Sequence, residues 1–246
     1  MKALWRVLTS FKTCAWAGLA FCLAGAAGSL AMGRYPWLFA DMDAQVFARW
    51  FARKGWIAPG ATLWLYGLLL ATGLLAVNAA CCTVEWLARI FRGTVTLRRL
   101  LPHVMHLAFL GVVLSHLAGA LYGDRVTGVT ILRGGVAPVG SKEWALRLDR
   151  FEAQIGPEGT PRDASATVTL FRDRTPLTRG VVRTNRPLFH EGYGIYLKEF
   201  GTTPYGVSYA VFDANRDPGA TAILVSSIVF TVANLLYLMP SRRTDA

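Results

Sequence analysis

Three of the four histidines of this chain lie in one apolar stretch, residues 101–123: His103, His106 and His116. A neutral imidazole is a good axial ligand for haem iron, and an ionisable group at membrane depth is by default a functional hypothesis. On a helix, His103 and His106 share a face, whereas His116 lies about 15 Å beyond His106 along the axis and points elsewhere. The pattern predicts haem-iron ligation, first by His106 and second by His116. Packing histidines that hydrogen bond between helices are the alternative.

The fourth histidine, His190, lies in a polar region and is the third candidate for contact with haem. That region contains no nucleophile elbow, no phosphate loop and no zinc-ligand spacing. We therefore expect no catalytic residue in this chain, so that any enzymatic role belongs to a larger complex. No CxxCH occurs either, which excludes a c-type cytochrome.

Four long stretches without a formal charge must position these residues. Each holds about 20 mostly apolar residues, enough to cross a bilayer as a helix. We expect membrane spans at 13–33, 61–84, 102–123 and 218–240. The first span begins like a signal peptide, but its apolar run is longer than a signal h-region, so we expect a retained helix. Because the other three spans contain no histidine, a haem bound by residues 102–123 would take its opposite ligand from another subunit.

The net charge of +11 reflects membrane topology rather than a nucleic-acid partner. The segments Met1–Lys12, Glu85–Arg99 and Arg242–Ala246 hold nine Lys and Arg residues but only two acids. The positive-inside rule then places the termini (1–12 and 241–246) and the basic loop 85–101 in the cytoplasm. Residues 34–60 and 124–217 are expected outside.

The two exterior segments differ in their patterns. Within 34–60, the run Asp43–Lys54 predicts a short amphipathic helix that ends at Gly55 and lies on the membrane or on the soluble domain. Residues 124–217 predict an antiparallel β sandwich or barrel of about six strands. Turn signals separate the strands at 134–135, 156–159, Thr175–Pro176 and 202–204. The runs rich in Val, Thr, Tyr and Phe are 125–133, 144–151, 166–172, 180–184, 194–200 and 207–213. The fold class is thus four transmembrane α-helices with an exterior antiparallel β domain between helices 3 and 4.

Three further residues carry local expectations. Pro102 suits the first position of the third membrane helix, because a helix leaves its first amides unpaired. Trp86 falls at a cytoplasmic helix end, where an indole anchors a span at the membrane interface. Asn78 lies at membrane depth, where we expect it to hydrogen bond between helices.

The chain resembles the ResB/CcsB membrane proteins of the system II cytochrome c maturation pathway. The resemblance is carried by TLWLYGLLLATGLLAVNAACC in the second span, by HLAFLGVVLSHLAGALYG with the following ILRGG, and by the late segment TNRPLFHEGYGIYLKEF. The late segment follows the family pattern through Thr184, Asn185, Pro187, Leu188, Gly192, Ile195 and Tyr196. The order of three spans, an exterior β domain and a final span also matches.

The resemblance implies a haem-handling scaffold subunit of a system II cytochrome c synthase complex. Such a subunit assists haem export and attachment to apocytochrome c in a bacterial-type inner membrane, beside a Trp-rich ResC/CcsA-like membrane protein. The implied cofactor is haem b, held transiently and shared with that partner. By its position in the HLAF segment, His106 takes the role of the family's haem ligand. Arg183, Arg186 and Lys198 would meet haem propionates or an acidic face of apocytochrome, unless they form only a solvated basic surface.

Two other functions stay open at this point. A cytochrome b-type electron-transfer subunit would hold a stable, stoichiometric haem. A structural assembly factor would carry no haem at all.

Overall fold

The computed structural model describes residues 2–90, 97–140, 143–155 and 161–239. Residues 91–96 of the expected basic loop, the expected cytoplasmic C-terminus and the turn expected near 156–159 lie outside these residues. The chain divides into two compact units. The helical unit comprises 1–40, 51–119 and 219–246, and the β unit comprises 41–50 and 120–218.

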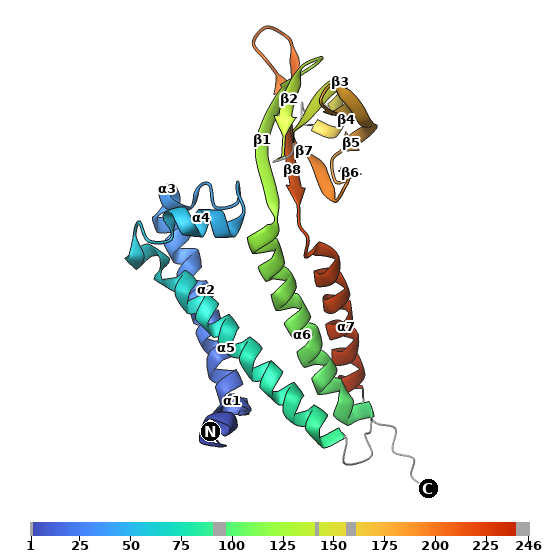
Figure 1. The fold of residues 1–246 in the computed structure, drawn as a ribbon. Helices are drawn as coiled ribbons and strands as arrows, with labels where there is room; N and C mark the ends of the chain where they lie inside the picture. Colours follow the sequence, from blue (N-terminus) through green and yellow to red (C-terminus); the bar gives the residue numbers. More distant parts are fainter. Residues whose placement is uncertain (1, 91–96, 141–142, 156–160, 240–246) are drawn as a thin grey trace. The chain divides into compact units, whose positions relative to one another are not determined.

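Seven helices occur in the described residues, and four of them are long and apolar enough to cross a membrane (Figure 1). The protein is therefore a multi-pass membrane protein. The helices are α1 (Lys2–Leu8), α2 (Phe11–Arg34), α3 (Pro36–Phe39), α4 (Phe47–Lys54), α5 (Pro59–Ile90), α6 (Leu97–Tyr122) and α7 (Ala220–Leu238). The four candidate spans lie in α2, α5, α6 and α7.

Helices α2 and α5 pack closely along each other (Figure 1). Gly28 of α2 is buried, and a Cβ atom there would overlap the indole of Trp64 in α5. Asn78 of α5 donates hydrogen bonds to the carbonyl oxygens of Leu8, at 2.5 Å, and Ser10, at 3.2 Å. These carbonyls lie where α1 ends and α2 begins, so the expected contact of Asn78 with another helix is present and joins α5 to this junction.

The third span differs from expectation at its start. Helix α6 begins at Leu97, so Pro102 lies inside the helix and not at its first position. The proline ring removes the amide hydrogen that would bond the carbonyl of Arg98. Pro102 is the sixth residue of α6 and lies beyond the first turn, whose amides have no intrahelical partner, so the helix loses one backbone hydrogen bond near its start.

The β unit contains two four-stranded antiparallel sheets, ordered β1-β8-β7-β6 and β2-β3-β4-β5. The strands are β1 (Asp124–Leu132), β2 (Val136–Val139), β3 (Trp144–Ile155), β4 (Pro161–Arg172), β5 (Thr175–Arg183), β6 (Leu188–His190), β7 (Tyr193–Thr202) and β8 (Ser208–Arg216). Residues 41–50 belong to the same unit, and Arg125 donates a hydrogen bond of 2.9 Å to the carbonyl of Asp43. An antiparallel β domain between the third and fourth spans is thus confirmed.

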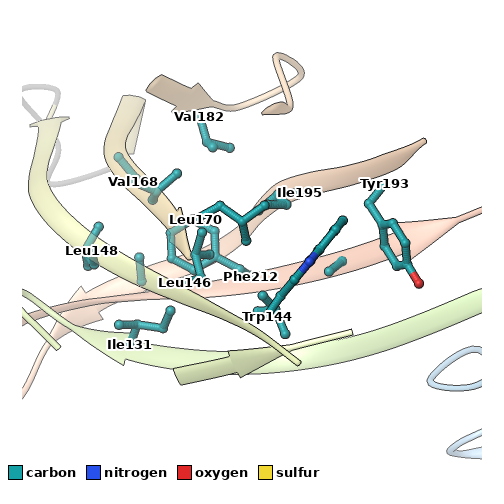
Figure 2. Close-up of a cluster of buried hydrophobic side chains, with 14 residues drawn as sticks. Ile131, Trp144, Leu146, Leu148, Val168, Leu170, Val182, Tyr193, Ile195 and Phe212 are labelled. Atoms are coloured by element: carbon teal, nitrogen blue, oxygen red, sulfur yellow. The ribbon is translucent and has the colours of Figure 1, made fainter. Parts of the chain in front are cut away.

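The core of the β unit lies between the inner faces of the two sheets (Figure 2). Leu146, Leu170 and Phe212 are fully buried at its centre, and Trp144 and Tyr193 lie at one end. Alternation of inward apolar and outward polar residues along β3 and β4 produces this arrangement.

Two strands and one turn differ from the sequence-based expectation. Strands β2 and β6 were not expected, because β2 is four residues long and contains Pro138, and β6 has only three residues. The turn expected at Thr175–Pro176 lies instead at Asp173 and Arg174, whose φ angles are 49° and 70°. Both central residues are left-handed, which is the geometry of a two-residue hairpin turn, so Thr175 and Pro176 already belong to β5.

The two motifs of the β unit that resemble the ResB/CcsB proteins have clear structural roles. The glycines of ILRGG form the connection from β1 to β2, where Gly134 has a φ of 80° and its amide bonds the carbonyl of Leu148. In the late segment, Gly192 has a φ of 79° in the turn between β6 and β7. Leu188 packs against Gly180, where a Cβ atom would clash. The segment is a strand, a turn and a strand.

Candidate functional site

The ends of α5 and α6 bring two histidines and a tryptophan together. The rings of His103 and Trp86 are stacked, with centroids 4.3 Å apart and planes 17° from parallel. The rings of His103 and His106 meet edge to face, 5.8 Å apart and 82° from parallel. The three rings form a continuous series, which we call the Trp86–His103–His106 cluster.

His106 contributes a buried polar atom to the cluster. Its Nδ1 atom is buried and has no hydrogen-bond partner among the residues that the structure describes. A buried polar atom without a partner costs free energy, so it is either a defect or a position that something else satisfies. Together with the flat apolar surfaces of Trp86 and His103, this orphaned nitrogen fits an aromatic metal-bearing ligand such as haem.

His116 does not join this cluster. It lies on the same helix but is exposed, whereas His103 and His106 are partly buried. The structure therefore brings together two of the three histidines of α6. An exposed histidine on a membrane helix faces lipid or another subunit.

His190 lies in β6 of the β unit. Its ring packs against Trp144, with centroids 5.6 Å apart, and its Nε2 atom is buried, 3.9 Å from a carboxylate oxygen of Glu191. Glu191 in turn pairs with Arg172 at 3.3 Å. The Nε2 atom is thus turned toward a carboxylate and an indole. This arrangement suits a structural role at the turn between β6 and β7.

The three basic residues near the late segment differ in their surroundings. Lys198 pairs with Asp213 at 3.4 Å, so its charge is already partly compensated. Arg183 and Arg186 are exposed and exchange two backbone hydrogen bonds of 3.0 Å across a tight turn. That turn presents both guanidinium groups to solvent.

The outer face of β3, β4 and β5 carries a buried carboxylate. Asp149 accepts a hydrogen bond of 2.5 Å from Thr169 and one of 2.6 Å from Arg147, and Arg179 lies 3.4 Å away. Burial raises the pKa of Asp149, but the hydrogen bonds from Thr169 and Arg147 and the charges of Arg147 and Arg179 outweigh it. The pKa of Asp149 therefore lies below its ordinary value.

An open groove of about 440 Å³ lies beside Asp149. It is lined by Arg147, Thr169, Phe171, Pro176, Leu177, Thr178 and Arg179. Its two arginines face Asp149, which compensates part of their charge. No group of three or more His, Cys, Asp or Glu side chains placed to hold a metal ion occurs within the described ranges.

Trp86 belongs to the candidate site, but the sequence analysis did not assign it there. Its position at a helix end indicated an interface anchor, whereas the structure stacks it on His103. The positions of these two residues in the sequence could have indicated the contact. Trp86 ends one span and His103 begins the next, and two antiparallel helices joined by a short loop bring such ends together.

A family model matches the part of the chain that holds two of the three motifs. The model of the ResB-like family matches residues 91–208. Among solved structures, the chain is similar to one titled "Cytochrome c Heme Lyase CcmF", with 16% sequence identity and a TM-score of 0.44. That match covers 78% of this chain and only 32% of the other, so this chain spans about a third of that protein. A search of curated proteins found no match.

Proposed function

Since the chain is ResB-like over residues 91–208, and the ResB-like family belongs to cytochrome c biogenesis, we propose that it is a haem-handling scaffold subunit of a cytochrome c synthase complex. In this role it holds haem in the membrane and assists its export and its attachment to apocytochrome c. The observation that supports this role best is the buried, unpartnered Nδ1 atom of His106 beside two flat rings.

His106 is the proposed axial ligand of the haem iron. Bound haem would supply an iron atom for a histidine to ligate and the porphyrin that is attached to apocytochrome c. The chain's own part would be to bind the iron through His106, beside the rings of Trp86 and His103. The spans of α2, α5 and α7 contain no histidine, so the opposite position falls to a partner, proposed to be a Trp-rich ResC/CcsA-like protein.

The β unit is proposed to bind and position rather than to catalyse. It contains no cysteine, and its one histidine packs against Trp144 and Glu191. Arg183 and Arg186 are its exposed pair of cations for haem propionates or for an acidic face of apocytochrome c. Lys198 contributes less, because Asp213 compensates its charge.

The test replaces His106 by Ala in the complex purified from membranes through a tag on this chain. We expect haem content to fall to a small fraction of the wild-type value and cytochrome c maturation to stop. Added imidazole should partly restore both, because its ring can enter the space left by the side chain.

His116→Ala is the matched control, because it removes an exposed histidine from the same helix. We expect this variant to retain most of the haem. If His106→Ala keeps wild-type haem content and maturation, the proposed ligand is wrong. If His116→Ala shows the larger loss, the ligand is His116.

A further inference from the structure

The orientation of His106 depends on a residue that belongs to another helix. His106 contacts His103, and His103 is stacked on Trp86 of α5 with planes only 17° from parallel. Trp86 does not itself contact the proposed iron ligand in this arrangement. Its influence would pass through the ring of His103.

We propose that Trp86 and His103 are positioning residues that set the ring plane of His106 for haem. This inference rests on the proposed function, because it assigns how that same site is built. The indole of Trp86 fixes the plane of His103, and the edge-to-face contact then fixes the plane of His106 nearly perpendicular to it.

The physical reason is that, within the part of the chain that the structure describes, Nδ1 of His106 has no hydrogen bond that could hold the ring. Histidines that bind metals usually donate their second nitrogen to a carboxylate or carbonyl group, which fixes their orientation. In His106 the unpartnered Nδ1 is the atom left open for the iron, so no hydrogen bond at Nδ1 holds this ring. A ring contact also restricts rotation about the bond from Cβ to the imidazole, and the contact with His103 is one.

The arrangement also links two spans through the site. Trp86 is near the end of α5 and His103 is near the start of α6, so the ring series joins them across the connecting loop. A change in the distance or angle between these two helix ends would therefore change the orientation of the ring of His106. The separation of these two helix ends and the coordination of haem are thus coupled through Trp86.

The experiment uses the full chain in its membrane complex and reads two properties besides maturation. These are the g-values of low-spin ferric haem in electron paramagnetic resonance, which depend on axial ring orientation, and the dissociation constant for added haemin. For Trp86→Leu we expect haem to remain bound, with shifted or broadened g-values and a dissociation constant about 3- to 10-fold higher, as expected for loss of one aromatic pair. Trp86→Phe keeps a flat ring and should stay within about twofold of wild type.

A second pair of variants tests the same inference from α6, in case Trp86→Leu is not recovered as a complex. His103→Ala removes the contact with His106 and should reproduce the shift, whereas His103→Phe keeps a ring at that place and should not. Trp16→Leu is the matched control, because Trp16 is an exposed tryptophan of α2. It should leave both readings unchanged.

The results separate this inference from the proposed function. If His106→Ala loses haem while Trp86→Leu and His103→Ala keep wild-type g-values and affinity, the positioning role is wrong and the haem site stands. If His106→Ala itself keeps wild-type haem, both are wrong. If His103→Ala loses the haem and His106→Ala does not, His103 is the ligand and the positioning role is overturned.

Discussion

Asp149 shows how the surroundings of one residue determine its contribution to stability. Its carboxylate is 12% exposed and is contacted by Arg147, Thr169 and Arg179. Replacing Asp149 by Asn should lower the free energy of unfolding of the β unit at pH 7 by about 1–3 kcal/mol, the range for hydrogen bonds to a charged group. Pulse proteolysis of the full chain in increasing urea measures this difference.

The pH dependence of this effect follows from the lowered pKa of Asp149. The stabilisation is fully present above the unfolded-state pKa of about 3.9 and is lost as pH falls through the lower folded-state pKa. The difference between wild type and Asp149→Asn should therefore shrink below about pH 4. Glu152→Gln is the control, because the pair of Glu152 with Arg150 is exposed and worth about 0–1 kcal/mol. Equal losses in the two variants at pH 7 would contradict the argument.

Local surroundings also distinguish the histidines from one another. His106 and His116 lie on one helix, yet one has a buried, unpartnered nitrogen and the other is exposed. His190, at the end of β6, also has a buried nitrogen without a hydrogen-bond partner, but that Nε2 atom lies 3.9 Å from a carboxylate oxygen of Glu191 and its ring packs against Trp144. Residue type alone makes all three candidates for iron ligation, whereas burial and neighbours favour His106.

At the scale of elements, the contact of α2 with α5 depends on one glycine. Gly28→Ala should separate the two helices and destabilise the helical unit by about 1–3 kcal/mol, because the new Cβ atom overlaps the rigid indole of Trp64. Thermal unfolding of the full chain in detergent measures the effect. Gly25→Ala is the matched control one turn away, since nothing lies within 4 Å of a Cβ atom there. Alanine has the higher helix propensity, so Gly25→Ala should be neutral or stabilising, and a loss at Gly25 as large as at Gly28 would contradict the role of the contact with Trp64.

Two strands that the sequence analysis did not predict are explained by their neighbours in the sheets. Strands β2 and β6 are both short and both lie at the edge of a sheet. An edge strand has one neighbour in its sheet, so three or four residues and a proline are tolerated there. Such strands form because their neighbours β3 and β7 are in place, not because of their own sequence.

At the scale of the whole molecule, the basic segments predict which side each region occupies. We expect a reporter fused at Gly93 to be cytoplasmic and one fused at Asp173, in the turn between β4 and β5, to be exterior. Alkaline phosphatase, active only outside, and a fluorescent protein, active only inside, measure this. If both fusions report the same side, the arrangement of four spans is wrong.

Much of the architecture was determined by the sequence itself. Four apolar stretches predicted the spans, and alternating β-branched residues between the third and fourth predicted the β domain, which the structure confirms. The placement of His103 and His106 on one face of a helix was also predictable, and their rings are in contact. These features depend on length and periodicity, which are local properties of the chain.

Only the tertiary structure decided which side chains meet across elements. It stacked Trp86 on His103, paired Lys198 with Asp213 and surrounded Asp149 with residues from three strands. It also placed Pro102 inside α6. The physical reason is that such contacts depend on how helices and strands approach each other through packing, and periodicity along one element contains no information about the side chains of its neighbours.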